Sequence, residues 1–330
     1  MNNEEVEDYL NSLMTNDVPL EVQGMIKNLS YSGKRALVDL YNPNSKFHKH
    51  GDINSNVLQF GLNTNSNTTL YHYTSVSSLE KILESGYFRI KASGFMNDPD
   101  EFKWASTLSK EILSNIGASD EEIDAFNKMI DSQPFKDAYI WSFTKNSDSQ
   151  SLFATYGNKD GVALEFSLPM IMKTLAQHNS HGKKLLQDFE KGDAYTFPLK
   201  VEYNEKIQKS YLEPITLEWL LSLRAFKEDP FDMKNIMLTC SQNISLFNMA
   251  FKNPLLYQEE EIRFIVLYIG ESNIPELEIN GIPYTRCELK DDLIRSVKLQ
   301  KGNKYNKTKI ADLLKKTNNH IQVMDSHLPY

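Results

Sequence analysis

The chain of 330 residues is 40% hydrophobic and 24% charged, and its formal net charge is −8. This composition is typical of a globular protein with a sizeable core, and the negative charge argues against non-specific binding along a nucleic-acid backbone. No run approaches the roughly 20 apolar residues that span a bilayer, and the acidic start is unlike a signal peptide. We therefore expect a cytoplasmic protein without a membrane partner.

Cysteine and histidine spacing predicts neither a disulfide framework nor a metal site. Cys240 and Cys287 are the two cysteines, and their spacing does not fit a paired metal-ligand motif. His48 and His50 form a His-x-His pair, but no third ligand is near them in the sequence. We expect the cysteines to be buried thiols and no metal to be bound.

The N-terminal part of the chain predicts helices followed by a connecting loop. Apolar residues recur at helical spacing over residues 4–41, whereas residues 42–69 are rich in Asn, Ser, Gly and His. We therefore divide the chain into an N-terminal helical segment with an Asn-rich loop, residues 1–67, and a single α+β domain, residues 68–330.

This second part opens with a strand, a helix and a strand. Residues 70–74 are typical of a short strand, and Ser77 with Glu80 three residues later matches a capping box before an apolar stripe. Gly86 stands where a helix ends in the left-handed conformation, and residues 87–90 follow as a strand.

The later elements lack the regular strand and helix spacing of a doubly wound fold. Asp98 before Pro99 predicts the start of a helix. The other predicted helices cover residues 119–131, 150–156, 168–190, 213–252 and 307–317, and the other strands cover residues 139–144, 161–166, 197–203 and 257–269, with edge strands over residues 284–289 and 293–299. This order favours an α+β fold with a mixed, largely antiparallel sheet and flanking helices.

Residues 257–269 predict a central strand with a charged entrance. The stretch opens with three carboxylates and then becomes almost wholly apolar, as in strands buried on both faces. Since side chains alternate along a strand, Glu259, Glu261 and Arg263 would share one face. Glu260 would point to the other face. Either Arg263 pairs with the glutamates and caps the strand, or these charges meet a ligand.

The order of these signals resembles a widespread bacterial family catalogued only as a domain of unknown function. The likeness covers roughly residues 68–330 and rests on Tyr71-His72-Tyr73-Thr74, Phe95-Met96-Asn97-Asp98-Pro99-Asp100-Glu101, Trp141-Ser142-Phe143-Thr144 with the helix that ends at Tyr156, and Glu259-Glu260-Glu261-Ile262-Arg263. Phe153 departs from the pattern, because that family commonly has Trp at this position. The departure should affect packing more than chemistry.

More distantly, the chain resembles the ADP-ribosyltransferase superfamily. Its members carry a His on the first strand before a helix that ends in Gly, a Ser or Tyr on a middle strand, and a late strand with the Glu, often as Glu-x-Glu. His72, Gly86 and the pair Glu259 and Glu261 stand at matching places in this sequence. The resemblance implies an ADP-ribosyltransferase-like fold that uses NAD as a substrate.

The resemblance also implies catalytic roles for three residues. Glu261 would stabilise the oxocarbenium character that develops when the nicotinamide–ribose bond of NAD breaks. Glu259 would orient the acceptor nucleophile or accept its proton, and His72 would hydrogen-bond the ribose as a neutral imidazole. These roles require His72 and Glu261 to face one cleft, and the superfamily likeness fails if the two residues lie on opposite sides of the sheet.

Several further residues are candidates for binding NAD. Tyr73, Trp141 or Tyr156 would stack on the nicotinamide. Ser142, Thr144 and Tyr156 remain alternatives for the middle-strand position. The other candidates are Arg89, Asn97 and Arg263.

These expectations lead to an NAD-binding, ADP-ribosyltransferase-like protein that transfers ADP-ribose to a macromolecular acceptor, either protein or nucleic acid. We expect such a protein to be a bacterial toxin, effector or phage-defence factor. The alternative is a non-catalytic module that senses a nucleotide with the same fold. Saturable binding of NAD without turnover would distinguish this module from an enzyme.

Overall fold

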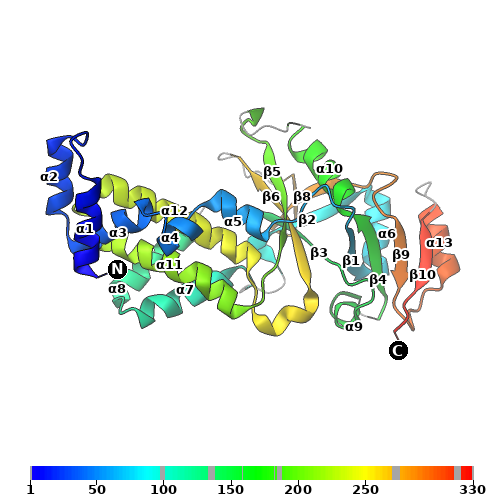
Figure 1. The fold of residues 1–330 in the computed structure, drawn as a ribbon. Coiled ribbons are helices and arrows are strands. Elements are labelled where there is room, and N and C mark those ends of the chain that lie inside the picture. The colour runs from blue at the N-terminus through cyan, green and yellow to red at the C-terminus, as the bar shows by residue number, and fades with distance from the viewer. Residues whose placement is uncertain are drawn as a thin grey trace. The chain divides into compact units, whose positions relative to one another are not determined.

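The computed structural model of the chain describes residues 2–96, 101–132, 138–157, 159–181, 183, 188–269, 276–315 and 321–328 (Figure 1). The chain forms two compact units, each made of three segments. A helical unit comprises Met1–Phe60, Asp100–Lys136 and Glu202–Lys252, and a sheet unit comprises Gly61–Pro99, Asp137–Val201 and Asn253–Tyr330. These units differ from the predicted division into residues 1–67 and 68–330, because two later helical segments pack with the N-terminal helices.

Two long helices, α11 (Glu205–Ala225) and α12 (Pro230–Ala250), form the centre of the helical unit. They pack against each other and against shorter helices. The elements of this unit are α1 (Asn3–Leu13), α2 (Leu20–Asn28), α3 (Tyr31–Tyr41), α4 (Lys46–His50), α5 (Ile53–Phe60), η2 (Glu101–Lys103), α7 (Trp104–Asn115), α8 (Asp120–Asp131), α11 (Glu205–Ala225) and α12 (Pro230–Ala250). Among the helices of both units that the structure describes, none combines the length and the apolar composition needed to cross a bilayer.

The predicted loop of residues 42–69 contains two of these helices, α4 and α5. Phe47 in α4 and Phe60 in α5 are buried. The side-chain amide of Asn56 in α5 donates to Oδ1 of Asn243 on α12 at 2.6 Å. The loop prediction is wrong over this stretch because tertiary packing, which local composition does not report, holds short helices that would be marginal alone.

The described residues of the sheet unit form ten strands with helices around them. Its elements are β1 (Thr69–Ser75), α6 (Val76–Ser85), β2 (Tyr87–Ala92), η1 (Ser93–Phe95), β3 (Tyr139–Thr144), α9 (Gln150–Leu152), η4 (Phe153–Gly157), β4 (Gly161–Ser167), α10 (Leu168–Asn179), β5 (Ala194–Lys200), η6 (Pro254–Glu259), β6 (Glu261–Tyr268), β7 (Leu277–Ile279), β8 (Ile282–Glu288), β9 (Ser296–Leu299), α13 (Lys307–Lys315) and β10 (Gln322–Asp325).

The sheet branches at β3. The main path runs β10-β9-β4-β1-β3-β2-β8-β7, and β6 pairs with both β3 and β5. Among the described pairings, β1 meets β3 where Tyr71 faces Thr144, and β2 meets β3 at residues 139 and 140, so the sheet splits between β1 and β2. Of the described strand pairs, β9 with β10 is parallel and the others are antiparallel. The predicted α+β class with a largely antiparallel sheet is therefore confirmed.

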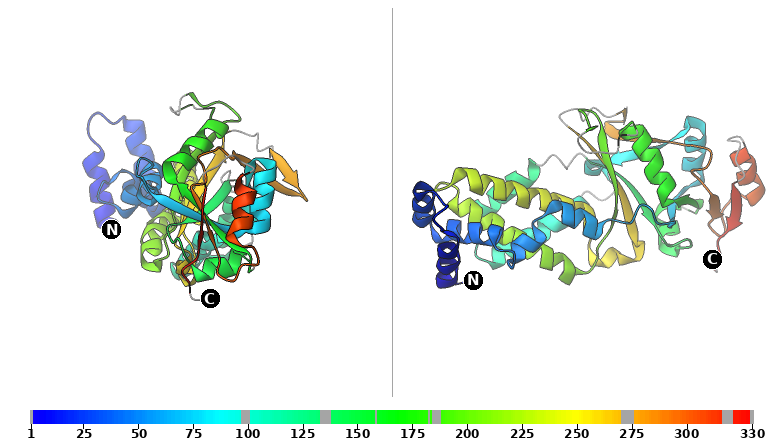
Figure 2. Two further views of the ribbon diagram at one scale, coloured as in Figure 1. Left: turned by 90° about the vertical axis from the view of Figure 1, so that its right-hand side faces the viewer. Right: turned by 45° about the horizontal axis from the view of Figure 1, so that its top comes forward.

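The two faces of the sheet differ in chemistry. We call the side that carries Trp141 and Phe264 the core face, and the side that carries Thr144 and Glu261 the polar face. Helices α6, α10 and α13 contribute buried apolar side chains to the cluster on the core face. Figure 2 shows α6 (cyan) and α13 (red) near each other, although they are far apart in sequence. Most of the apolar core of this unit therefore lies on one side of the sheet.

Local sequence signals predicted some boundaries of helices and strands correctly and others incorrectly. Gly86, with φ of +76°, ends α6 as predicted. The N-cap of α6 is Ser75 rather than Ser77, since Ser75 Oγ accepts a hydrogen bond from the backbone N–H of Ser78 at 3.1 Å. The predicted helix start at Asp98 lies outside the described residues.

The predicted central strand begins later than expected. β6 is paired on both sides, which confirms it as a central strand, but it starts at Glu261. Glu259 ends the short helix η6, and Glu260 has the left-handed φ of +45°. The expected alternation of Glu259 and Glu261 on one strand face therefore fails, because a helical turn separates the first glutamate from the strand.

Candidate functional site

Five polar side chains form a row across five adjacent strands on the polar face. In register, Ser296 on β9 pairs with Glu165 on β4, and Glu165 pairs with Tyr71 on β1. Tyr71 pairs with Thr144 on β3, and Thr144 pairs with Glu261 on β6. Residues in register on neighbouring strands lie about 5 Å apart and project on one side. We call these five residues the polar row.

The middle of the polar row presents two hydroxyl groups. Burial raises the pKa of Tyr71, and the nearby charge of Glu165 raises it further, although a hydrogen bond with the Ser147 side chain partly offsets this effect, so the phenol stays protonated at neutral pH. Thr144 is buried, and its Oγ1 accepts a hydrogen bond from the backbone N–H of Asn146 at 3.1 Å. Both hydroxyl groups can therefore act as donors toward a ligand oxygen.

Carboxylates lie on both sides of these hydroxyl groups. Glu261 is 5% exposed, and its Oε2 accepts a hydrogen bond at 2.9 Å from Nη2 of Arg263, which is fully buried two residues further along β6. On the other side, Glu165 accepts a hydrogen bond from the hydroxyl of Ser296. The ion pair of Glu261 with Arg263 offsets the cost of burying these two opposite charges, each of which would be costly to bury alone.

His72 lies on the core face, opposite Glu261. Its ring packs beside Trp141 and Phe143, with ring centroids at 5.9 and 5.6 Å. Tyr71, its neighbour in β1, is in the polar row, and neighbouring residues of a strand point to opposite faces. The structure therefore does not bring His72 and Glu261 into one cleft, and the expected superfamily likeness fails at this pair of residues.

The imidazole of His72 has a hydrogen-bond partner within the sheet. Its Nδ1 lies 2.9 Å from the carbonyl oxygen of Ser142 and donates to it, in the region where β1 has separated from β3. Burial lowers the pKa of His72, although the Ser142 carbonyl partly offsets this effect. The neutral imidazole thus donates a hydrogen bond to a strand carbonyl beside the split in the sheet.

The three predicted nicotinamide-stacking residues have different surroundings. Trp141 is buried on the core face, away from Glu261. Tyr73 is on the polar face, but its hydroxyl donates to the Asn146 carbonyl at 2.8 Å and accepts from the Ser149 N–H at 2.9 Å. These bonds hold the turn after β3. Tyr156 lies in the helical turn η4 and is 40% exposed.

The other predicted binding residues are scattered. Ser142 shares the polar face and lies in register with Arg263, so it borders the polar row. Arg89 is exposed on β2, in register with Arg286 of β8, beyond the split in the sheet. Glu259 lies at the end of η6, and Asn97 lies outside the described residues. Thr144, Ser142, Glu261 and Arg263 are the predicted residues that the sheet brings together.

Sequence reasoning missed three members of the polar row. Tyr71 stands beside the predicted His72, and Glu165 and Ser296 lie on strands whose partners the sequence does not name. A polar residue within an apolar strand, such as Glu165 in β4, is the signal that marks this position. Its neighbours on other strands become known only through the register.

The turn after β3 joins the polar face to the C-terminal segment. Asp148 accepts hydrogen bonds from Oγ of Ser326 at 2.6 Å and from the backbone N–H of His327 at 2.7 Å. Lys298, two residues after the polar-row residue Ser296, donates from Nζ to Oγ of Ser147 at 3.2 Å. These contacts hold one edge of the polar row in place without using its own side chains.

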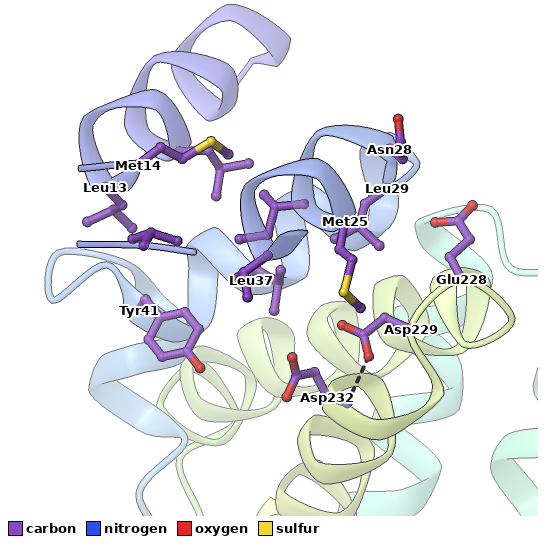
Figure 3. A pocket seen from close by; sticks show the side chains of 14 residues that line it. Leu13, Met14, Met25, Asn28, Leu29, Leu37, Tyr41, Glu228, Asp229 and Asp232 are labelled. Atoms are coloured by element: carbon purple, nitrogen blue, oxygen red, sulfur yellow. Dashed lines mark hydrogen bonds between the residues drawn. The ribbon is translucent and has the colours of Figure 1, made fainter. Parts of the chain in front are cut away.

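A second candidate site is an apolar groove in the helical unit, with a volume of about 680 Å³. Figure 3 shows side chains of the first three helices and of the segments between them converging on it, with the carboxylates of Glu228, Asp229 and Asp232 along one edge. The sequence did not predict this groove, because the residues that line it are spread over four helices and the segments beside them.

Within the ranges that the structure describes, no group of three or more His, Cys, Asp or Glu side chains is arranged to hold a metal ion. No protein-family model, curated protein or solved structure matches this chain. The function proposed next therefore depends on the arrangement of the described side chains.

Proposed function

We propose that the polar row binds the ribose-bearing part of NAD and that the protein transfers ADP-ribose to a macromolecular acceptor. The polar row is the observation that supports this proposal. Glu165 and Glu261 flank two hydroxyl groups on one sheet face, and a ribose offers several hydroxyl groups to carboxylate and hydroxyl partners. His72 is not part of this site, because it lies on the core face, where its imidazole donates to the Ser142 carbonyl.

In the proposed transfer, the bond between C1′ of the ribose and the nicotinamide nitrogen breaks, and its electron pair leaves with nicotinamide. The acceptor nucleophile forms the new bond to C1′ and loses its proton to a base or to water. Positive charge develops on the ribose ring in the transition state, and the carboxylate of Glu261 would stabilise it. Tyr71 and Thr144 would orient the sugar by hydrogen bonds.

A second function, nucleotide binding without turnover, is favoured by one observation. Glu261 already accepts a hydrogen bond from the buried Arg263 guanidinium. This positive charge opposes the electrostatic stabilisation that a developing cation on the ribose requires. A sensing module needs only the hydrogen-bonding capacity of the row.

The test uses the purified full chain, NAD labelled in its adenylate part, and a cell lysate as the source of acceptors. Nicotinamide release and labelled acceptor are both measured. Glu261→Gln is expected to reduce nicotinamide release by about 100-fold or more, because the carboxylate charge acts mainly in the transition state. Glu260→Gln is the matched control, because Glu260 is exposed and next in sequence, and it should retain the wild-type rate.

Equal rates in the wild type and in Glu261→Gln would contradict the catalytic role. Calorimetry separates the second function: saturable NAD binding that Tyr71→Phe and Thr144→Val weaken, without nicotinamide release, supports a sensing module. If the wild type neither binds nor cleaves NAD, both functions are excluded.

A further inference from the structure

The groove of the helical unit has apolar walls that are incompletely buried. Leu13 on α1 and Met25 on α2 are 44% and 64% exposed, and Tyr41 at the end of α3 is 59% exposed. None of the nine residues of α2, all of which the structure describes, is fully buried. Helix α2 therefore forms one wall of the groove (Figure 3) while its apolar side still contacts water.

One edge of the groove carries carboxylates without cationic partners. No Lys, Arg or His among the described residues lies within ion-pair distance of Asp229 or Asp232 at the start of α12. Burial raises the pKa of Asp232, and charge repulsion from the neighbouring Asp229, together with a side-chain hydrogen bond between the two carboxyl groups, raises it further. A cation placed at this edge would relieve that repulsion.

The helical unit also carries the whole net charge of the chain. Its three segments hold 23 Asp and Glu residues against 15 Lys and Arg, a difference of −8, whereas the sheet unit holds 21 of each. A field of one sign favours a partner of the opposite sign and accelerates its association.

We propose that this groove binds an amphipathic helix of a partner protein that carries Lys or Arg beside its apolar stripe. Leu, Val and Met side chains on the walls match the apolar residues that recur at every third or fourth position of such a helix. Met14 and Met25 add unbranched, adaptable side chains, which are common in helix-binding grooves. Asp229 and Asp232 would pair with the basic side chains at the edge, and the bound helix would complete the packing of α2.

The test measures fluorescence anisotropy of a labelled synthetic helix with a Leu stripe and Lys at its polar positions, titrated with the full chain. A second peptide has Glu in place of each Lys. The Lys peptide is expected to bind, and more weakly as salt rises, whereas the Glu peptide should not bind. Leu13→Gln should raise Kd about tenfold by removing apolar contact, and Asp232→Asn should raise it severalfold.

Leu238→Gln is the matched control, because Leu238 is also a helical leucine of this unit, is 50% exposed, and lies outside the groove. It should leave Kd unchanged. Circular dichroism of each variant confirms folding. Equal effects of Leu13→Gln and Leu238→Gln, or equal binding of both peptides, would overturn the proposal. So would a dimer of the chain that Leu13→Gln dissociates while neither peptide binds, since the groove would then receive a second copy.

Discussion

His72 and Glu261 project from opposite faces of the same sheet, because Tyr71, the neighbour of His72, is the residue in register with Thr144 and Glu261. This relationship moves the candidate site away from His72. Under the proposed function, Tyr71 takes the ribose-binding role predicted for the histidine, because its side chain shares the sheet face of Glu261. Tyr71 and His72 belong to the same four-residue motif, so the proposal keeps the motif and changes the residue within it.

Substituting His72 by Phe should affect stability more than function. The Phe ring keeps the contacts with Trp141 and Phe143 but leaves the Ser142 carbonyl without its imidazole donor. We expect the free energy of unfolding to fall by about 1–2 kcal/mol, measured by urea denaturation. Any NAD turnover should stay within about twofold of the wild type when catalysis involves only the other face. A turnover defect of several hundredfold in a variant with unchanged stability would place His72 in the site.

The pair of Arg263 and Glu261 should show strong energetic coupling. Arg263→Met leaves the buried carboxylate without its guanidinium, and we expect a loss of about 3–5 kcal/mol in the free energy of unfolding. Glu261→Gln removes the other charge. The double variant should be more stable than the sum of the two single losses predicts, as measured by denaturation of all four proteins in a double-mutant cycle. Additive losses would mean that the two charges do not stabilise each other.

Glu218 should make stability depend on pH. It is 1% exposed in α11, no hydrogen bond to its Oε1 is described, and burial raises its pKa well above the ordinary value. As pH rises from about 4.5, the unfolded chain releases this proton before the folded chain does, so stability falls until the folded pKa is passed. Glu218→Gln should therefore stabilise the protein at pH 8, by about 1–2 kcal/mol.

The measurement for Glu218 is denaturation of each protein between pH 4 and pH 8. Glu213→Gln is the control, because Glu213 is exposed on the same helix. The free energy of unfolding of the wild type and of the Glu213→Gln control should decline as pH rises. The Glu218→Gln variant should show a smaller decline. An identical pH profile in all three proteins would show that Glu218 titrates as it does in the unfolded chain.

Gly161 at the start of β4 should not tolerate a side chain. A Cβ there would lie 2.7 Å from Oε1 of Gln300 and 2.8 Å from Cδ1 of Phe153. Gly161→Ala should therefore lower the free energy of unfolding by about 1–3 kcal/mol. Gly94→Ala is the comparison in the same unit, since nothing lies within 4 Å of its added Cβ, and it should change stability by less than about 0.5 kcal/mol. Thermal melts of both variants provide the measurement, and equal shifts in Tm would show that the packing around Gly161 adapts.

Elements with strong local signals were predictable from the sequence. Gly86 ends its helix in the left-handed conformation, the helix predicted over residues 119–131 forms as Asp120–Asp131, and the predicted central strand forms over the later part of residues 257–269, as Glu261–Tyr268. Each of these features depends on a few neighbouring residues. The α+β class followed from the order of such elements.

Tertiary structure alone decided how these elements combine. The helices within residues 42–69 form because Phe47 and Phe60 are buried and Asn56 bonds to Asn243, which is distant in sequence.

The sequence by itself determined that residues 70–74 are a strand and that the motif there carries Tyr71 and His72. The sequence did not determine whether Tyr71 or His72 lies on the same sheet face as Glu261, because a shift of one residue in register moves every side chain of a strand to the other face. The pairing of β1 with β3 and of β3 with β6 made that choice, and it joined Tyr71, Thr144 and Glu261 in one polar row.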